Sequence, residues 1–163
     1  MEYIGEVKFM ERTFVAVKPD GVKRGLIGKI LQRFEEKSYK IVALKMLNVS
    51  DELAAKHYEE HYGKPFYPNL IRFITSGPIV AMAIEGKNAI HGVRHIVGST
   101  NPDEADVGSI RADFSQNSAT NLVHASDSEA SAKRELNLYF KEDEYCSNYK
   151  NMYEIISSEL NLP

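Results

Sequence analysis

Several features that define other protein classes are scarce or missing in this sequence. It has one cysteine among 163 residues, which excludes an intramolecular disulfide and is typical of a reducing compartment. No apolar run approaches the roughly 18 residues of a membrane span. The N-terminal MEYIGEVKFMERTF is charged too early for a signal-peptide core. We therefore expect a cytoplasmic protein that does not enter a membrane.

An excess of basic residues is also missing. Acidic residues number 23 against 20 lysines and arginines, so the formal net charge is -3. A global basic field that would attract nucleic acid is therefore excluded, and no specific nucleic-acid partner is predicted. With 43% hydrophobic and 26% charged residues the composition is globular, and the length is that of one domain. We expect residues 1–163 to form a single domain.

Four β-rich stretches alternate with stretches of helical periodicity. The expected strands are 12–18, 38–49, 78–86 and 120–124. The expected helices are 25–37, about 50–61, 70–76, 87–98, about 128–140 and 150–160. The stretch 99–119 has little apolar periodicity, and so long a loop in a compact domain is usually functional. This order predicts an α/β sandwich, but periodicity leaves open whether the sheet is parallel or antiparallel.

The stretch NLVHASDS (121–128) places His124 where a strand gives way to a helix. Ser126, Asp127 and Ser128 are all good helix N-cap residues. Free backbone N–H groups and the positive end of a helix dipole favour an anion beside an imidazole at such a point. A structural histidine with satisfied hydrogen bonds is the alternative interpretation.

Three cations are candidates for holding such an anion. Lys18 ends the first expected strand, and Arg111 lies within the long stretch 99–119. Arg94 belongs to an expected helix whose inward face we assign to Ile90, Val93 and Ile96. Phosphoryl transfer needs cations of this kind, because negative charge spreads over the phosphoryl oxygens in the transition state. For each cation, solvated surface charge is the alternative.

Glu135 is a candidate partner for the histidine. It lies eleven positions after His124, between the apolar positions Ala132 and Leu136 of the next helix. This phase turns it toward the strand that carries His124, where a carboxylate would orient the ring. A surface glutamate paired with Lys133 is the alternative.

A rival motif is HYEEH (57–61), which matches the inverted zinc-protease pattern H-x-x-E-H. Histidines at i and i+4 share one face of a helix and could bind one zinc ion. No third ligand is obvious, and Lys56 and Lys64 flank the motif. An amphipathic surface helix is the better interpretation.

Taken together, these residues resemble the nucleoside diphosphate kinase family from about residue 11 to about residue 155. The matching stretches are ERTFVAVKPDGVKRGLIG (11–28), HYEEHYGKPFY (57–67), SGPIVAMAIEG (76–86), VRHIVGSTNP (93–102), GSIRADF (108–114) and NLVHASDS (121–128). The resemblance implies an α+β fold, a ferredoxin-like four-stranded antiparallel sheet covered by helices. It implies a phosphotransferase that passes the γ-phosphate of ATP or another nucleoside triphosphate to nucleoside diphosphates. The route would be ping-pong through a phosphohistidine, without a Walker phosphate loop, and would maintain the triphosphate pools.

The resemblance also assigns catalytic roles to individual residues. His124 would be the nucleophile, attacking through Nδ1, and Ser126 and Glu135 would fix its ring. Tyr58 would donate a hydrogen bond near the transferred phosphoryl group. The tyrosine of the HYEEH motif, and not its histidines, would then be the functional residue.

The resemblance likewise implies a set of nucleotide-binding residues. Phe66 would stack on the base, which tolerates every base because each has a π-face, and Leu70 would line the base slot more loosely. Asn121 would reach the ribose hydroxyls, while Thr100 and the three cations would bind phosphate oxygens. The expected nucleotide-binding residues are Lys18, Phe66, Arg94, Thr100, Arg111 and Asn121. Mg²⁺ is the implied cofactor, held by the nucleotide phosphates and not directly by the protein.

The implied assembly is a homo-oligomer. Asn101-Pro102 matches the trimer-contact loop of the family, so a hexamer is favoured, with the tetramer of some bacterial members as the alternative. Ala125 departs from the usual glycine after the histidine, at a cost of about 1 kcal/mol if that position needs a positive φ. Residues 1–9 precede the matching region and are interpreted as an N-terminal extension or an artefact of start-site choice.

Other functions stay open at this point. A related fold that has lost catalysis would be a nucleotide-binding or interaction module, although it would have no need of His124. A ferredoxin-like nucleic-acid-binding domain is disfavoured by the acidic balance and the lack of an aromatic RNP-type stretch. Zinc hydrolysis rests on the HYEEH motif alone.

Overall fold

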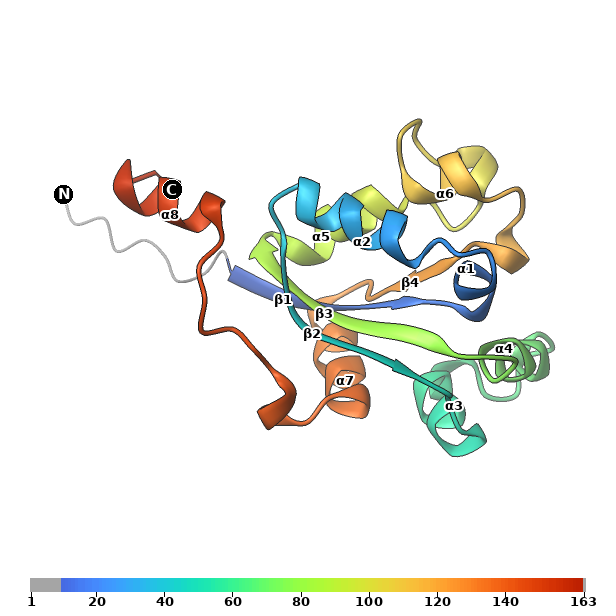
Figure 1. Cartoon of the computed structure of the whole chain (residues 1–163). Coiled ribbons are helices and arrows are strands. Elements are labelled where there is room, and N and C mark those ends of the chain that lie inside the picture. Colours follow the sequence, from blue (N-terminus) through green and yellow to red (C-terminus); the bar gives the residue numbers. More distant parts are fainter. Residues whose placement is uncertain (1–9, 163) are drawn as a thin grey trace.

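A computed structural model describes residues 10–162, whose sheet has four strands, all paired antiparallel in the order β2-β3-β1-β4 (Figure 1). The strands are β1 (Met10–Val17), β2 (Lys40–Leu47), β3 (Ile79–Lys87) and β4 (Val123–Ala125). The expected four-stranded antiparallel sheet with helices is therefore confirmed. Residues 1–9, which we interpret as an extension or a start-site artefact, lie outside the described part of the chain.

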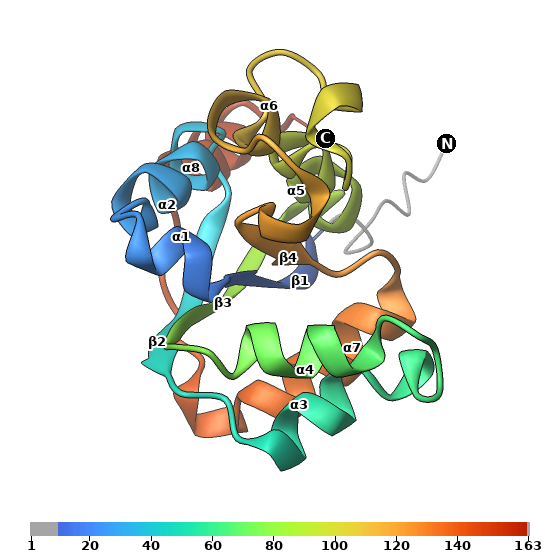
Figure 2. The same ribbon diagram turned by 90° about the vertical axis from the view of Figure 1, so that its right-hand side faces the viewer.

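Helices cover both faces of the sheet (Figure 2). The α-helices are α1 (Pro19–Lys23), α2 (Ile27–Glu36), α3 (Asp51–His57), α4 (Tyr67–Ile74), α5 (Ala89–Val97), α6 (Ile110–Phe114), α7 (Glu129–Tyr139) and α8 (Met152–Glu159). Helices α2, α5 and α6 pack on one face, whereas α3, α4 and α7 pack on the other. None of the helices described in residues 10–162 has the length and apolar character needed to span a bilayer.

Strand β1 is central, and its sequence shows why two cores form. Val15 and Val17 belong to the core beneath α2 and α5, whereas Phe14 and Ala16 belong to the core beneath α3 and α7. Successive side chains of a strand point to opposite faces, so a strand covered on both faces is apolar at every position. The run Phe14–Val17 follows from this double burial.

The structure corrects several expected boundaries. Helix α3 ends at His57, and the expected helical stretch continues only as a 3-10 turn, Glu59–His61. The long stretch 99–119 contains α6, which begins after Ser109, whose side chain accepts from the Ala112 N–H and caps the helix. The residues directly after Lys18, Pro19–Lys23, form the short helix α1.

The inward face assigned to the helix at 87–98 is correct for Val93 and Ile96, which lie in or against the core, whereas Ile90 is not among the core residues. Val93 is buried, but the other fully buried residues of α5 are Ala89 and Val97, four residues before and after it. Ile90 and Ile96 are half-buried. A spacing of four residues on each side of Val93 is the ordinary repeat of one helical face, and small Ala89 lets the helix lie close to the sheet.

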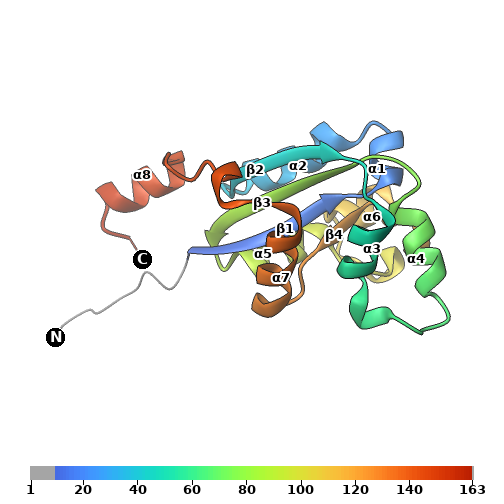
Figure 3. The same ribbon diagram turned by 90° about the horizontal axis from the view of Figure 1, so that it is seen from below.

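The C-terminal segment runs along the outer edge of β2. The Cys146 N–H donates to Val42 O, and the Tyr149 hydroxyl donates to Ile41 O. Lys40 Nζ donates to Tyr149 O and lies 3.1 Å from Glu154 Oε1. The segment thereby satisfies backbone groups of an edge strand. Helix α8 lies at the end of the molecule opposite α4 (Figures 1 and 3).

Candidate active site

A cavity of about 720 Å³ opens between β4, the turn before it and the helices α3 and α4. Almost every residue singled out from the sequence lines it. These residues are Lys18, Tyr58, Phe66, Leu70, Arg94, Thr100, Arg111, Asn121, His124 and Glu135. Ser126 does not line the cavity and lies buried behind it. Residues spread over more than a hundred positions of the chain therefore converge on one place.

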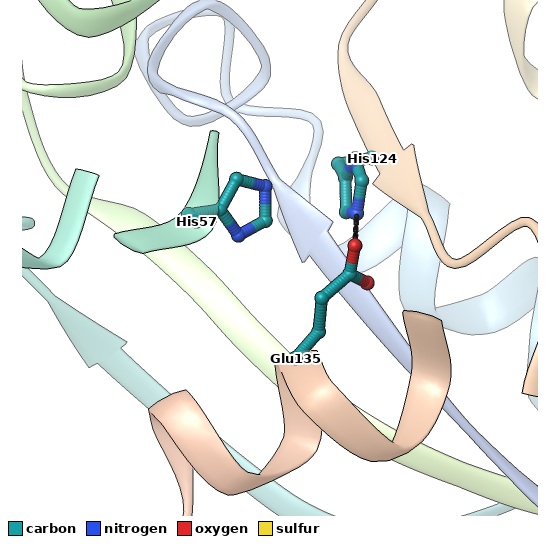
Figure 4. Close-up of side chains that lie close together, drawn as sticks. All are labelled: His57, His124 and Glu135. Carbon is teal, nitrogen blue, oxygen red and sulfur yellow. Dashed lines mark ion pairs between the residues drawn. The ribbon is translucent and has the colours of Figure 1, made fainter. Parts of the chain in front are cut away.

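His124 and Glu135 both line the cavity and face each other (Figure 4). His124 is on the edge strand β4 and pairs with Ala16, while its side chain stays 26% exposed. Its Nε2 lies 3.0 Å from Glu135 Oε1, an ion-pair distance without the alignment of a hydrogen bond. The helical phase of α7 turns Glu135 toward the strand as expected. Nε2 is thus the ring nitrogen that faces the carboxylate, and Nδ1 is the ring nitrogen that does not.

Ser126 acts on Glu135 and not on the imidazole. Its buried hydroxyl donates to Glu135 Oε2 and lies 3.4 Å from Phe14 O. The N-cap of α7 is Ser128, whose side chain accepts from the Ser131 N–H. Of the three candidate cap residues, one caps the helix and another holds the carboxylate that faces His124.

Lys18 is a cation in a largely desolvated place. Burial lowers its pKa to about 8; the carboxylate of Asp20 acts in the opposite direction, and the charge of Arg111 lowers it further. Its Nζ donates to the Asn121 side-chain oxygen, and the Asn121 amide donates to Thr100 O at 3.0 Å. In mildly alkaline solution, the Lys18 side chain is therefore a mixture of the charged ammonium and the neutral amine.

Arg111 is buried, with 7% of its surface exposed. Its Nε and both terminal nitrogens donate to the backbone oxygens of Asn121, Gly98 and Val123. Burial lowers the pKa of Arg111 to about 10, helped by the nearby charge of Arg94 and opposed by Asp20. The guanidinium thus lines the cavity, and its hydrogen bonds also hold the backbone segment that leads to His124.

Three further predicted residues line the cavity with different degrees of exposure. Arg94 is exposed on α5 and donates to Ala125 O at 3.2 Å. Burial, together with the charge of Glu135, raises the pKa of Tyr58 to about 12, so its hydroxyl stays a neutral donor. Phe66 directly precedes α4, lines the cavity with 47% of its surface exposed, and has Lys64 Nζ 5.8 Å from its ring centroid.

His57 also belongs to this site, although sequence reasoning assigned no role to it. Its ring packs edge-on against His124 with 4.7 Å between centroids, and only 3% of the residue is exposed (Figure 4). Burial, followed by the effect of His124, lowers its pKa to about 2. The available signal was helical phase, because Leu53, Ala54 and His57 recur at inward-facing spacing.

The zinc motif is not assembled as the pattern requires. His57 is buried beside His124, and its Nδ1 lies 3.3 Å from the Tyr139 hydroxyl. His61 follows a break in the helix, and its Nδ1 lies 3.1 Å from Lys64 Nζ. Since the two histidines no longer share one helical face, they do not form the i, i+4 pair that the inverted zinc-protease pattern describes.

Ala125 meets no backbone strain. Its φ is not positive, and the residue pairs with Val15 as an ordinary strand position. The cost considered for a methyl group at this position therefore does not arise. The left-handed residue of this segment is Leu122, with φ of 73°.

The comparison with known proteins agrees with this geometry. Residues 11–145 match the family model described as nucleoside diphosphate kinase. The nucleoside diphosphate kinase of Methanocaldococcus jannaschii is 58% identical over 134 residues, which is 82% of this chain and 96% of that protein. A nucleoside diphosphate kinase family protein from Babesia bovis has a solved structure with TM-score 0.85 and 43% identity, covering 90% of this chain and 98% of that one.

A structure with a bound nucleotide is also similar. The halophilic nucleoside diphosphate kinase from Halobacterium salinarum, solved in complex with CDP, has TM-score 0.85 and 43% identity over 94% of this chain and 99% of that one. The family model covers well over half of the chain, and the identity to the relatives is high. The chain therefore belongs to the nucleoside diphosphate kinase family, which confirms the phosphotransferase activity and the ferredoxin-like fold expected from the resemblance.

Proposed function

We propose that His124 carries the phosphate between nucleotides in two half-reactions. In the first, Nδ1 attacks the γ-phosphorus of ATP or another nucleoside triphosphate. An N–P bond forms, the bond to the β–γ bridging oxygen breaks, and a nucleoside diphosphate leaves. In the second, a terminal phosphate oxygen of a new diphosphate attacks the same phosphorus, and the N–P bond breaks. The net exchange maintains the pools of triphosphates and deoxytriphosphates.

The observation that carries this proposal is the contact between His124 Nε2 and Glu135 Oε1 at 3.0 Å. A carboxylate beside Nε2 favours the tautomer with the proton on Nε2, which leaves a lone pair on Nδ1. It also stabilises the positive charge that the ring gains when Nδ1 bonds to phosphorus. Ser126 supports this arrangement by donating to the other carboxylate oxygen.

The cations of the cavity would hold the phosphates. Within residues 10–162, the hydrogen bonds of Lys18 Nζ and Arg94 leave some of their donors unused, and Arg111 adds a buried positive charge beside them. Positive charge in a poorly solvated cavity stabilises the spread of negative charge over the transferring group. Thr100 and the neutral hydroxyl of Tyr58 would add hydrogen bonds to phosphoryl oxygens.

The base and ribose would lie toward the opposite end of the cavity. The exposed ring of Phe66 would stack on the base, with Leu70 lining the same slot. Asn121 would reach the ribose hydroxyls from the turn before β4. Stacking provides affinity without reading the base edges, so all nucleoside triphosphates and diphosphates are expected substrates.

Mg²⁺ is the proposed cofactor, and the residues present fit a metal held by the nucleotide. Mg²⁺ takes oxygen ligands and keeps several waters. Among residues 10–162, the ligating side chains that come together within 4.8 Å are those of His57, His124 and Glu135, and two of these three donors are imidazoles. Phosphate oxygens and water suit Mg²⁺ better, which leaves His124 free. When bound, the ion neutralises charge on the leaving diphosphate.

We further infer that residues 1–163 act as one domain of a cytoplasmic homo-oligomer. Pro102 is buried at the start of a 3-10 turn, Pro102–Glu104, in the loop that corresponds to the family's trimer contact. A hexamer is favoured, and a tetramer is the alternative. Sedimentation equilibrium distinguishes the two by mass.

Phosphoenzyme formation tests the proposed chemistry. Purified protein is mixed with Mg²⁺ and γ-labelled ATP, quenched, and separately chased with GDP, with His124→Ala in parallel. We expect label that is acid-labile, base-stable, absent from the variant and passed to GDP. Absence of label from a protein that still binds ATP would replace this proposal with a nucleotide-binding module.

A further inference from the structure

A strained turn lies directly before the strand that carries His124. Leu122 has a φ of 73°, and the N–H of Val123 donates to Asn121 O at 2.8 Å. This is a γ-turn with a positive φ at its central residue, a rare and strained conformation for any residue with a side chain. Such a turn persists only where its surroundings hold it.

The backbone of this turn is held from two directions. Arg111 donates to the carbonyl oxygens of Asn121 and Val123, on either side of Leu122. The two polar backbone groups of Leu122 itself are bound by the segment after β1. The Lys18 N–H donates to Leu122 O at 2.8 Å, and Asp20 Oδ2 accepts the Leu122 N–H at 3.0 Å.

We propose that Asp20 is a positioning residue for phosphoryl transfer, acting through Leu122. By accepting the buried Leu122 N–H, its carboxylate fixes the turn that begins at Asn121 and leads through Val123 into His124. The same contact ties that turn to the start of α1, directly after Lys18. The inference rests on the proposed roles of Lys18 and His124, and it adds the group that fixes the position of one relative to the other.

The segment around Asp20 is shaped for this contact. A Cβ built on Gly21 would lie 3.2 Å from Leu122 O and 2.7 Å from a methyl carbon of Val17, so a larger residue would force the turn or Val17 to shift. The second oxygen of Asp20, Oδ1, is buried and has no hydrogen-bond partner within the described chain. Asp20 as a residue is half-buried, but a buried carboxylate oxygen without a partner is costly to keep, which points to a function for its charge.

That charge acts on the cations of the cavity. Lys18 is faced by Asp20 from α1, by Arg111 from α6, by the Asn121 amide oxygen and by the ring of Phe73 from α4. Of these, the Asp20 carboxylate raises the pKa of Lys18, and the Arg111 charge lowers it. Removing the carboxylate must therefore lower the pKa of Lys18, so that Lys18 loses its proton at a lower pH.

Two substitutions separate the hydrogen bond from the charge. Asp20→Asn keeps an oxygen that can accept the Leu122 N–H, whereas Asp20→Ala removes it; both remove the negative charge. Asp143→Ala, at an exposed position outside the cavity, is the control. The readouts are the rate of His124 phosphorylation per phosphorylatable site, kcat and KM for nucleotide, and the pH profile of kcat/KM.

We expect Asp20→Ala to slow phosphorylation by about 100-fold, the scale of a small misplacement of reacting groups. Asp20→Asn should recover most of this rate near neutral pH. In both variants the alkaline limb of kcat/KM should move to lower pH, while the control matches the parent. A merely structural role would reduce the fraction of phosphorylatable protein and leave the rate per site and the pH profile unchanged.

Two results would overturn the inference. One is an Asp20→Ala variant with the parent's rate per site. The other is an Asp20→Asn variant as slow as Asp20→Ala near neutral pH. If the parent protein itself takes no label, the proposed function fails first. A labelled parent with unaffected Asp20 variants removes the positioning role alone.

Discussion

Glu135 Oε1 lies 3.0 Å from Nε2 of His124, although the two residues belong to different elements. The contact depends on the phase of α7, which turns Glu135 inward together with Ala132, Leu136 and Tyr139. Burial of the carboxylate makes its interaction with the ring stronger than it would be in water. The pair is therefore the part of the site in which a change of charge has the most direct consequence for the nucleophile.

Glu135→Gln should slow phosphorylation of His124 by at least about 10-fold, because the neutral amide no longer stabilises the charge that the ring gains. Rapid-quench measurement of the labelled enzyme gives this rate directly. Glu129→Gln, at an exposed position on the same helix, is the matched control and should behave as the parent. Equal rates for parent and Glu135→Gln would show that the contact only packs the ring.

The activity should fall in alkaline solution as Lys18 loses its proton. Burial lowers the pKa of Lys18 to about 8, and only the protonated amine attracts phosphate. The plot of kcat/KM against pH should therefore decline above about pH 8. In Lys18→Arg, whose guanidinium stays charged, the decline should move to higher pH and the maximum should be lower.

Lys23→Arg, on the exposed side of α1, is the control for that experiment and should leave the profile unchanged. If the alkaline decline of kcat/KM occurs at the same pH in the parent and in Lys18→Arg, it reports the ionisation of another group.

His57 should make stability depend on pH below neutrality. Its folded-state pKa is lowered to about 2 from an ordinary value of 6.5, so between these values the unfolded chain binds a proton that the folded chain does not. The stabilising contribution is complete above pH 6.5 and is lost as the pH falls toward 2. In His57→Phe this contribution is absent.

Urea unfolding between pH 4 and pH 6, at one protein concentration, tests this expectation. With decreasing pH, the free energy of unfolding of the parent should fall more steeply than that of His57→Phe. For one proton, the two slopes should differ by up to about 1.4 kcal/mol per pH unit. Parallel curves for the two proteins would mean that His57 is protonated in the folded state.

Local sequence patterns predicted the elements that are long and periodic. Helix α2 has apolar residues at helical spacing, strand β1 is a short run rich in β-branched and aromatic residues, and Glu135 was placed correctly by helical periodicity. Helix α6 is five residues long, with Ile110 buried and Phe114 partly so, which is too short for a period to be recognised. Its capping serine, Ser109, was the usable signal.

Other features depend on contacts between distant parts of the chain. The strand order β2-β3-β1-β4 needs pairings that no local pattern encodes, so only the family resemblance predicted the antiparallel sheet. The positive φ of Leu122 is not readable from a leucine, because that side chain normally avoids the left-handed region. The hydrogen bonds that hold this turn come from Asp20, Lys18 and Arg111, which lie elsewhere in the chain.

The C-terminal segment should stabilise the edge of the sheet without contributing to catalysis. Lys40 is 5% exposed and lies 3.1 Å from Glu154 Oε1, with Glu85 at 3.7 Å and Tyr149 O at 3.0 Å. Glu154→Ala leaves this buried ammonium with fewer partners, which should lower the free energy of unfolding by about 1–3 kcal/mol. No residue of α8 lines the cavity around His124, so the rate of phosphorylation should stay that of the parent.

Glu159→Ala, which removes an exposed carboxylate from the same helix, is the matched control for this substitution. Urea unfolding and rapid-quench phosphorylation should be measured on the same preparations, because the prediction is a loss in one and no change in the other. A change in the phosphorylation rate of Glu154→Ala would mean that the C-terminal segment influences the site across the sheet. An unchanged free energy of unfolding would mean that Glu85 and Tyr149 suffice to hold the Lys40 charge.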